Sequence, residues 1–125
     1  MKRLLVITAA IEAGTGIGLL AAPAVLAQLL LGGTLDTPVA LTVARVGGTA
    51  LLAISVACWL SRENGRALVA AMLLYNVVVV GVLVYAALVL SLSGPGLWPA
   101  VALHLAFAFW CVACLRSKRV GATVL

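Results

Sequence analysis

Four long runs of apolar residues, separated by short polar segments, dominate the hydrophobic pattern of the chain. The runs cover about residues 4–21, 38–60, 67–90 and 98–115. Each is close to the length of about 20 residues that an α-helix needs to cross the hydrocarbon core of a bilayer. The pattern therefore predicts four transmembrane helices in one domain that spans residues 1–125.

Pro23 divides the first apolar segment, which is too long for a single untilted span. Proline removes a helix hydrogen bond and clashes with the preceding turn, so it ends a regular helix. We therefore expect a span over residues 4–21 and then a short interfacial helix over residues 24–31, which Gly32-Gly33 ends.

The composition excludes a soluble domain of ordinary type. Hydrophobic residues make up 66% of the chain and charged residues 9%, whereas a soluble domain has about 45–50% and about 25%. A chain of 125 residues cannot bury two-thirds of its side chains, because its surface is too large for its volume. The sequence thus predicts an all-α, integral membrane four-helix bundle in contact with the lipid bilayer.

The net charge of +5 comes from basic residues in the segments between spans, which indicates membrane orientation and not a nucleic-acid partner. The loop after the first span carries only Asp36. Positive residues mark the cytoplasmic side, so we expect both termini and the middle loop to be cytoplasmic. The basic residues on that side are Lys2, Arg3, Arg62, Arg66, Arg116, Lys118 and Arg119.

The N-terminal segment also resembles a secretory signal. Met1-Lys2-Arg3 is followed by an apolar run and by Val25-Leu26-Ala27, a small-residue pattern typical of a cleavage site. Glu12 interrupts the apolar run, which is also long for a signal. We expect an uncleaved first span, with cleavage as the alternative.

Polar side chains within the predicted spans are the candidate functional residues, because ionisable groups inside a membrane are costly and usually paired or functional. At about 1.5 Å per residue, Glu12, Tyr75 and Asn76 lie about 8 Å in depth from Arg45 and His104. We therefore expect one mid-membrane cluster, with Glu12 and Arg45 as an ion pair. The cluster holds the helices in register or binds a ligand.

Small residues indicate close helix packing. Ala10, Gly14 and Gly18 recur at every fourth position, and Gly47-Gly48 lies beside Arg45. Such spacing lets helix backbones approach each other in membranes. It predicts packing faces and a homodimer contact through Ala10, Gly14 and Gly18.

The cysteines permit a redox interpretation. Cys111 and Cys114 form a Cys-x-x-Cys string, as in thiol redox proteins and the vitamin K epoxide reductase family. Those enzymes use a second cysteine pair, whereas this chain has only Cys58 in addition. His104 is the single histidine, so a metal site is not predicted, and no cofactor is expected.

Five short strings are spread over residues 12–104, which is most of the chain. They are Glu12-Ala-Gly-Thr-Gly-Ile-Gly-Leu-Leu-Ala-Ala-Pro23, Leu29-Leu-Leu-Gly32, Ala44-Arg45-Val-Gly47, Leu74-Tyr75-Asn76 and Leu97-Trp98-Pro99-Ala-Val-Ala-Leu-His104. These strings resemble small bacterial four-helix membrane proteins, a group that looks like the DoxX-like superfamily. The resemblance implies the architecture, a bacterial inner-membrane location and importance for Glu12, Arg45, Asn76 and His104. It implies no reaction.

The chain is also similar to the small multidrug resistance transporters in its length, its four spans and its Glu12 in the first span. Their aromatic and glycine pattern is absent from the third span, where residues 77–80 are all valine. Three hypotheses follow. The first is a binding or accessory protein for a hydrophobic ligand or another membrane protein. The second is a proton-coupled transporter that uses Glu12, and the third is a redox protein that uses Cys111 and Cys114.

Overall fold

The computed structural model describes residues 1–117, which form five α-helices and no strand. Four helices are long: α1 (Lys2–Ala21), α3 (Pro38–Leu60), α4 (Arg66–Leu88) and α5 (Leu97–Ser117). The short α2 (Pro23–Leu31) follows α1. All five begin and end within two residues of the ranges expected from the sequence. Lys118 and Arg119 of the basic tail lie outside the described residues.

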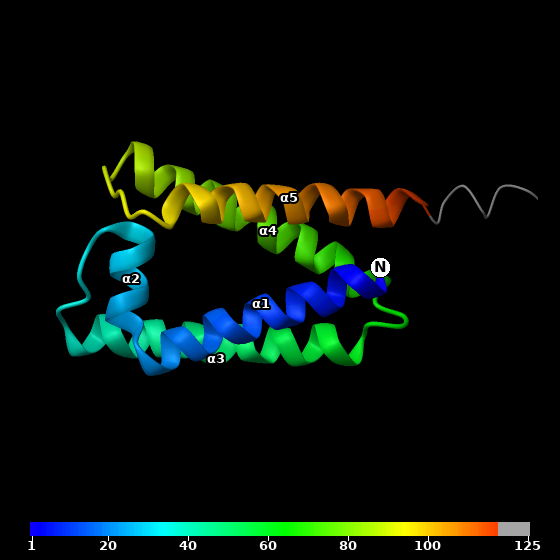
Figure 1. The fold of residues 1–125 in the computed structure, drawn as a ribbon, viewed down its shortest axis with the longest axis horizontal. Helices are drawn as coiled ribbons and strands as arrows, with labels where there is room; N and C mark the ends of the chain where they lie inside the picture. Colours follow the sequence, from blue (N-terminus) through cyan, green and yellow to red (C-terminus); the bar gives the residue numbers. More distant parts are fainter. Residues whose placement is uncertain (118–125) are drawn as a thin grey trace, which may run out of the picture.

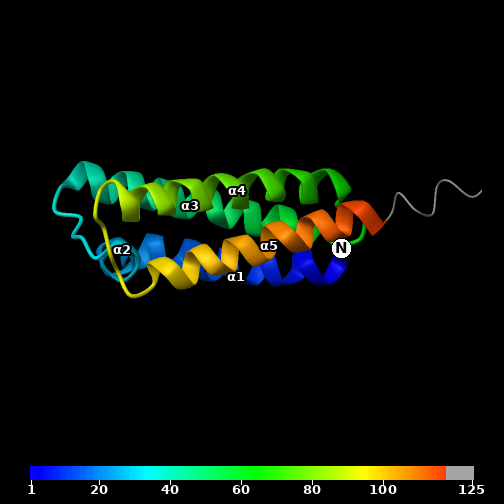
Figure 2. The ribbon, with the colours of Figure 1, turned by 90° about the horizontal axis from the view of Figure 1, so that it is seen from above.

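The long helices form two antiparallel pairs. α1 packs along α3, and α4 packs along α5 (Figure 1). Seen from above, α1 and α5 lie on one side of the bundle and α3 and α4 on the other (Figure 2). The N-terminus and the end of α5 share one end of the bundle, whereas α2 lies crosswise at the opposite end.

The outer surface of the bundle is strongly apolar. All four long helices are long and apolar enough to cross a membrane. Large hydrophobic side chains point outward along them, and Val39, Leu60 and Phe109 are each 73% exposed. A soluble monomer rarely exposes apolar surface on this scale. The fold is thus compatible with a multi-pass membrane protein.

The most tightly packed apolar core lies toward the end of the bundle that holds the N-terminus. Leu5, Cys58 and Val69 have no exposed surface, and Cys111 of α5 packs with them. All four long helices contribute to this core. It therefore joins the two helix pairs at that end of the bundle.

A close glycine contact sets the register of α1 on α3. A Cβ atom on Gly16 would lie 2.7 Å from the carbonyl oxygen of Gly48, and a Cβ on Gly48 would lie 2.7 Å from that of Gly16. Two turns away, the Ser55 hydroxyl donates a hydrogen bond of 2.6 Å to the Ala9 carbonyl.

The other glycines of the predicted packing faces lie elsewhere. A Cβ on Gly14 or Gly47 would meet nothing within 4 Å. The packing predicted for these two glycines within the chain is therefore wrong, and Gly16 makes the contact with Gly48 instead. The homodimer through Ala10, Gly14 and Gly18 stays a prediction.

The crosswise position of α2 follows from its two ends. Ala22 is not helical, with φ −142° and ψ 61°, as expected of a residue before proline. Gly32 ends α2 in the left-handed region, at φ 69°, which glycine adopts readily. The Gly96 amide then donates a hydrogen bond of 2.9 Å to the Leu29 carbonyl. This bond ties α2 to the turn before α5.

Candidate functional site

Glu12 lies inside the bundle on α1, with 5% of its surface exposed. The Tyr75 hydroxyl, from α4, donates a long hydrogen bond of 3.4 Å to Glu12 Oε2. The structure therefore brings Glu12 and Tyr75 together across the two helix pairs, as predicted from their similar depth.

Arg45 does not reach Glu12, so the predicted ion pair is wrong for the described chain. The Arg45 side chain is exposed, and its Nε donates a hydrogen bond of 3.3 Å to the Leu20 carbonyl. Leu20 lies about 12 Å along α1 from Glu12, at about 1.5 Å per residue. The contact of Gly16 with Gly48 fixes this register, and the guanidinium satisfies one of the carbonyls that the end of α1 leaves without a helix partner.

Asn76 and His104 form a second polar contact, between α4 and α5. The Asn76 amide nitrogen donates a hydrogen bond of 2.7 Å to the Met72 carbonyl. Its Oδ1 therefore faces His104 Nδ1, at 2.7 Å. An amide oxygen only accepts, so Nδ1 carries the proton, and Nε2 is the acceptor nitrogen of the neutral ring.

Tyr75 connects the two polar contacts. Its ring lies edge-on to the His104 ring, with the centroids 5.8 Å apart and the planes at 73°. Four of the five predicted cluster residues, Glu12, Tyr75, Asn76 and His104, thus lie together, and Arg45 lies apart.

A cavity of about 210 Å³ opens beside these residues. Its polar side carries Glu12, Thr15, Tyr75 and His104, and its apolar side consists mainly of leucines from α2 and α5. Side chains of α1, α2, α4 and α5 all contribute. The apolar lining residues are Ile11, Leu26, Leu29, Leu30, Ala100 and Leu103.

The polar side of the cavity offers hydrogen-bond acceptors. The Thr15 hydroxyl donates to the Ile11 carbonyl at 3.0 Å, the Tyr75 hydroxyl donates to Glu12, and His104 Nδ1 donates to Asn76. Each of these donors is thus already used within the chain. Lone pairs remain on the Glu12 carboxylate, on the two hydroxyl oxygens and on His104 Nε2.

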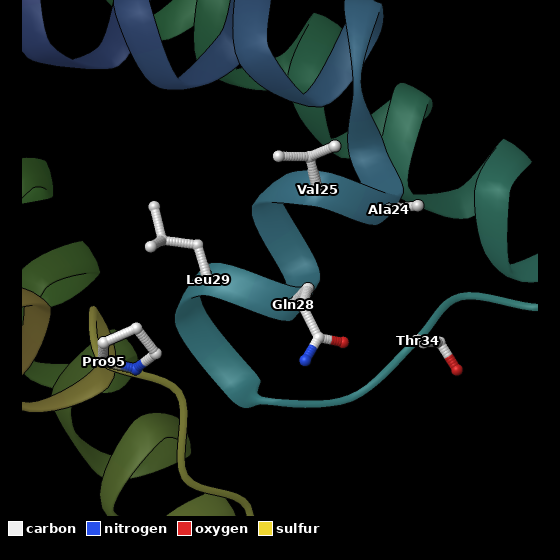
Figure 3. A pocket seen from close by; sticks show the side chains of 6 residues that line it. All are labelled: Ala24, Val25, Gln28, Leu29, Thr34 and Pro95. Carbon is white, nitrogen blue, oxygen red and sulfur yellow. The ribbon is translucent and has the colours of Figure 1, made fainter.

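A second hollow, of about 570 Å³, lies on the outer side of α2. Val25, Gln28 and Leu29 of α2 line it together with Thr34 and Pro95 (Figure 3). Leu29 borders both the inner cavity and this hollow. Helix α2 therefore lies between the cavity and this hollow.

The predicted redox cysteines lie in the apolar core and not at the cavity. Cys111 and Cys114 are free thiols, 1% and 8% exposed, and neither lines the cavity. A redox reaction needs a thiol that a substrate can reach. Within residues 1–117, no three His, Cys, Asp or Glu side chains lie close enough together to hold a metal ion.

Sequence reasoning did not identify the apolar side of the cavity or Thr15. Leu26, Leu29 and Leu30 belong to the segment that was expected to lie along the membrane interface. Pro23 indicates that the chain turns after α1, but a turn does not give the direction in which the following leucines face. The hydrogen bond of Gly96 to Leu29 holds α2 against the turn before α5. The sequence does not predict this contact, because the two residues lie far apart along the chain.

No family model, curated protein or solved structure matches this chain. The resemblances to the DoxX-like superfamily and to the small multidrug resistance transporters therefore stay predictions. The evidence for the candidate site is therefore the arrangement of its residues in the structure.

Proposed function

We propose that this protein is a multi-pass membrane protein that binds a small, largely apolar molecule carrying an N–H or O–H group. The cavity between α1, α2, α4 and α5 carries the proposal, because it combines leucine side chains with a polar side that has only acceptors left when Glu12 is ionised. A donor group on the ligand complements that side, whereas a carbonyl or carboxylate group does not.

The size of the cavity supports a ligand with one or two small rings. An apolar cavity of about 150 Å³ in another protein accommodates benzene, and this one has about 210 Å³. Burying a carboxylate without a charged partner is costly, and Glu12 has only the long hydrogen bond from Tyr75 among the described residues. A donor on the ligand reduces that cost.

Native mass spectrometry tests the proposal on protein extracted gently from its own membrane. We expect the wild type to retain a small molecule with an N–H or O–H group. Leu26→Phe fills the cavity and is expected to abolish retention, whereas Val25→Phe, on the outer side of α2, is expected to retain it. Equal occupancy in both variants, or none in the wild type, would contradict the proposal.

A matched probe pair tests the donor requirement. Indole carries an N–H donor, and 1-methylindole has almost the same shape without it. The ¹⁵N resonances of the single histidine, His104, report binding at the site itself. We expect indole to shift them at concentrations where 1-methylindole does not, and Leu26→Phe to abolish the shift. Equal shifts with both probes would exclude a role for the acceptors.

A proton-coupled transporter that uses Glu12 is the second candidate function. One observation favours it: Glu12 is buried with no basic side chain within 4.0 Å among residues 1–117. A carboxyl in that setting is able to exchange a proton for an organic cation. Proteoliposomes that take up such a cation under a proton gradient would support it, provided that Glu12→Gln abolishes uptake and Glu12→Asp retains part of it.

We also propose the bacterial inner membrane as the location, with the N-terminus and the end of α5 cytoplasmic. The basic residues Lys2, Arg3, Arg62, Arg66 and Arg116 all lie toward that end of the bundle, and Asp36 lies in the segment at the other end. This distribution supports the orientation. An impermeant maleimide is expected to label Lys2→Cys from the cytoplasmic side only and Asp36→Cys from the opposite side only. The reverse pattern, or labelling of both variants from the same side, would overturn the orientation.

A further inference from the structure

A basic groove lies far from the cavity, between the start of α4 and the end of α5. It has a volume of about 620 Å³, within the usual range of ligand sites. Two arginines line it together with three apolar residues: Arg66, Arg116, Ala67, Ala70 and Leu115. The groove therefore has a cationic part and an apolar part.

Arg66 is held in place at this groove. Its Nη2 donates a hydrogen bond of 3.2 Å to the Leu115 carbonyl, one of the last carbonyls of α5, which have no partner within the helix. A guanidinium has five N–H donors, so one bond to the backbone orients the group and leaves donors for a ligand.

The two arginines have no carboxylate partner within the described part of the chain. The ion pairs found there join Lys2 and Arg62 to Glu63, and no acidic oxygen lies within 4.0 Å of Arg66 or Arg116. Glu63 is the single acidic residue near this end of the bundle, which also carries Lys2, Arg3 and Arg62. The groove is therefore strongly electropositive.

The groove changes from charged to apolar along the helix axis. Arg66 is the first residue of α4, and Ala70 lies one turn further in, about 6 Å along the axis. The small side chains of Ala67 and Ala70 leave room beside Leu115. If α4 crosses a bilayer, its first residue lies at the level of the lipid head groups, and Ala70 lies next to the acyl chains.

We propose that this groove binds one acidic phospholipid. Its phosphate lies between the guanidinium groups of Arg66 and Arg116, and an acyl chain lies along Ala67, Ala70 and Leu115. A free phosphate ion matches only the arginines, and a zwitterionic phospholipid brings its own positive charge toward them. This site is separate from the cavity beneath α2, so it does not depend on the function proposed above.

Competition between two lipids tests the site. Purified full-length protein in neutral detergent receives equal amounts of phosphatidylglycerol and phosphatidylcholine with identical acyl chains, and native mass spectrometry counts the bound lipids. A basic residue near an acidic lipid contributes about 1 kcal/mol. For two arginines we therefore expect roughly 30-fold enrichment of phosphatidylglycerol. Equal binding of the two lipids would overturn the proposal.

Three variants distinguish lipid binding in the groove from a nonspecific effect of the positive charge at this end of the bundle. Arg66→Gln with Arg116→Gln is expected to abolish the enrichment. Arg116→Gln alone keeps the bond of Arg66 to Leu115, and we expect it to reduce the enrichment roughly fivefold with an unchanged circular dichroism spectrum. Arg3→Gln removes the same charge outside the groove and is expected to keep the enrichment.

Two further outcomes would overturn the proposal. One is a loss of enrichment in Arg3→Gln as large as in Arg116→Gln, because the preference would then reflect net charge alone. The other is complete displacement of phosphatidylglycerol by inorganic phosphate, because the apolar part of the groove would then contribute nothing.

Discussion

Gly16 and Gly48 lie directly against each other where α1 crosses α3. A Cβ atom on either glycine would lie 2.7 Å from the carbonyl oxygen of the other. This contact sets the register of the two helices, and the register places Arg45 beside Leu20 and Ser55 beside Ala9. It therefore keeps Arg45 at the end of α1 and away from Glu12.

Alanine at either glycine of this contact is expected to destabilise the protein. Gly16→Ala and Gly48→Ala each force the two backbones apart, because the nearest obstructing atom is in each case a main-chain carbonyl oxygen. Overpacking of this kind costs about 1–3 kcal/mol. Unfolding by sodium dodecyl sulfate in mixed micelles, followed by circular dichroism, measures the change.

Gly14→Ala and Gly47→Ala are the matched controls for this prediction. Both lie in the same helices, and a Cβ on either meets nothing within 4 Å. Alanine favours a helix by up to about 1 kcal/mol relative to glycine, so we expect these variants to be as stable as the wild type or more so. Equal losses in all four variants would contradict the assigned register.

Glu12 and Arg45 are expected to act independently on stability. They lie about 12 Å apart along α1, because Arg45 contacts the Leu20 carbonyl. The free-energy changes of Glu12→Gln and Arg45→Gln should therefore add in the double variant to within about 0.5 kcal/mol. An interaction energy of about 2 kcal/mol in the same micelle assay would contradict this prediction and support the ion pair expected from the sequence.

The sequence predicts most of the fold because the apolar runs and prolines act locally. Pro23 and Pro38 begin α2 and α3, and the length of each run matches its helix. The glycine contacts were predicted less well. The spacing of Gly14 and Gly18 indicates a packing face, but it does not identify Gly16 as the residue opposite Gly48.

The site was predicted in part for a similar reason. Depth along each helix was enough to predict the contact of Glu12 with Tyr75. It placed His104 about 8 Å from the level of Asn76, whereas the two side chains are hydrogen-bonded. It also failed for Arg45, because its long side chain reaches the end of α1 as easily as the centre, and only the register decides between them. The leucines of α2 also needed a contact made far along the chain, the bond of Gly96 to Leu29.

His104 is expected to carry its proton on Nδ1 when the ring is neutral. The Asn76 oxygen accepts from that nitrogen at 2.7 Å, so Nδ1–H is the tautomer that forms the bond. The ¹⁵N resonances of the single histidine distinguish the two tautomers. Asn76→Leu should remove this preference and lower the free energy of unfolding by about 1 kcal/mol. Tyr75→Phe leaves the bond of His104 to Asn76 intact and should keep the preference. A Nε2–H tautomer in the wild type would refute the assignment.

The three cysteines are expected to react with a maleimide only after unfolding. Cys58, Cys111 and Cys114 are at most 8% exposed, and a reagent must reach a thiol to modify it. Mass spectrometry should therefore find no adduct in the folded protein and three adducts in sodium dodecyl sulfate. Ser117→Cys, at the exposed end of α5, is the positive control. Rapid labelling of Cys111 in the folded protein would reopen the redox interpretation.

The pairing of Glu63 with Lys2 makes a pH-dependent contribution to stability. The Lys2 ammonium, 2.6 Å from Glu63 Oε1, holds the pKa of this carboxyl below its ordinary value of 4.5. A carboxyl with a lowered pKa in the folded state stabilises the protein above its unfolded pKa, and this stabilisation is lost as the pH falls through the folded pKa.

We therefore expect the wild type to have a higher melting temperature than Glu63→Gln at pH 7. The difference should shrink as the pH falls below 4.5 and disappear once the pH is below the lowered pKa of the folded state. It should also shrink in high salt, because the pair is exposed. A difference that persists at acidic pH would show that Glu63 stabilises the protein through something other than its charge.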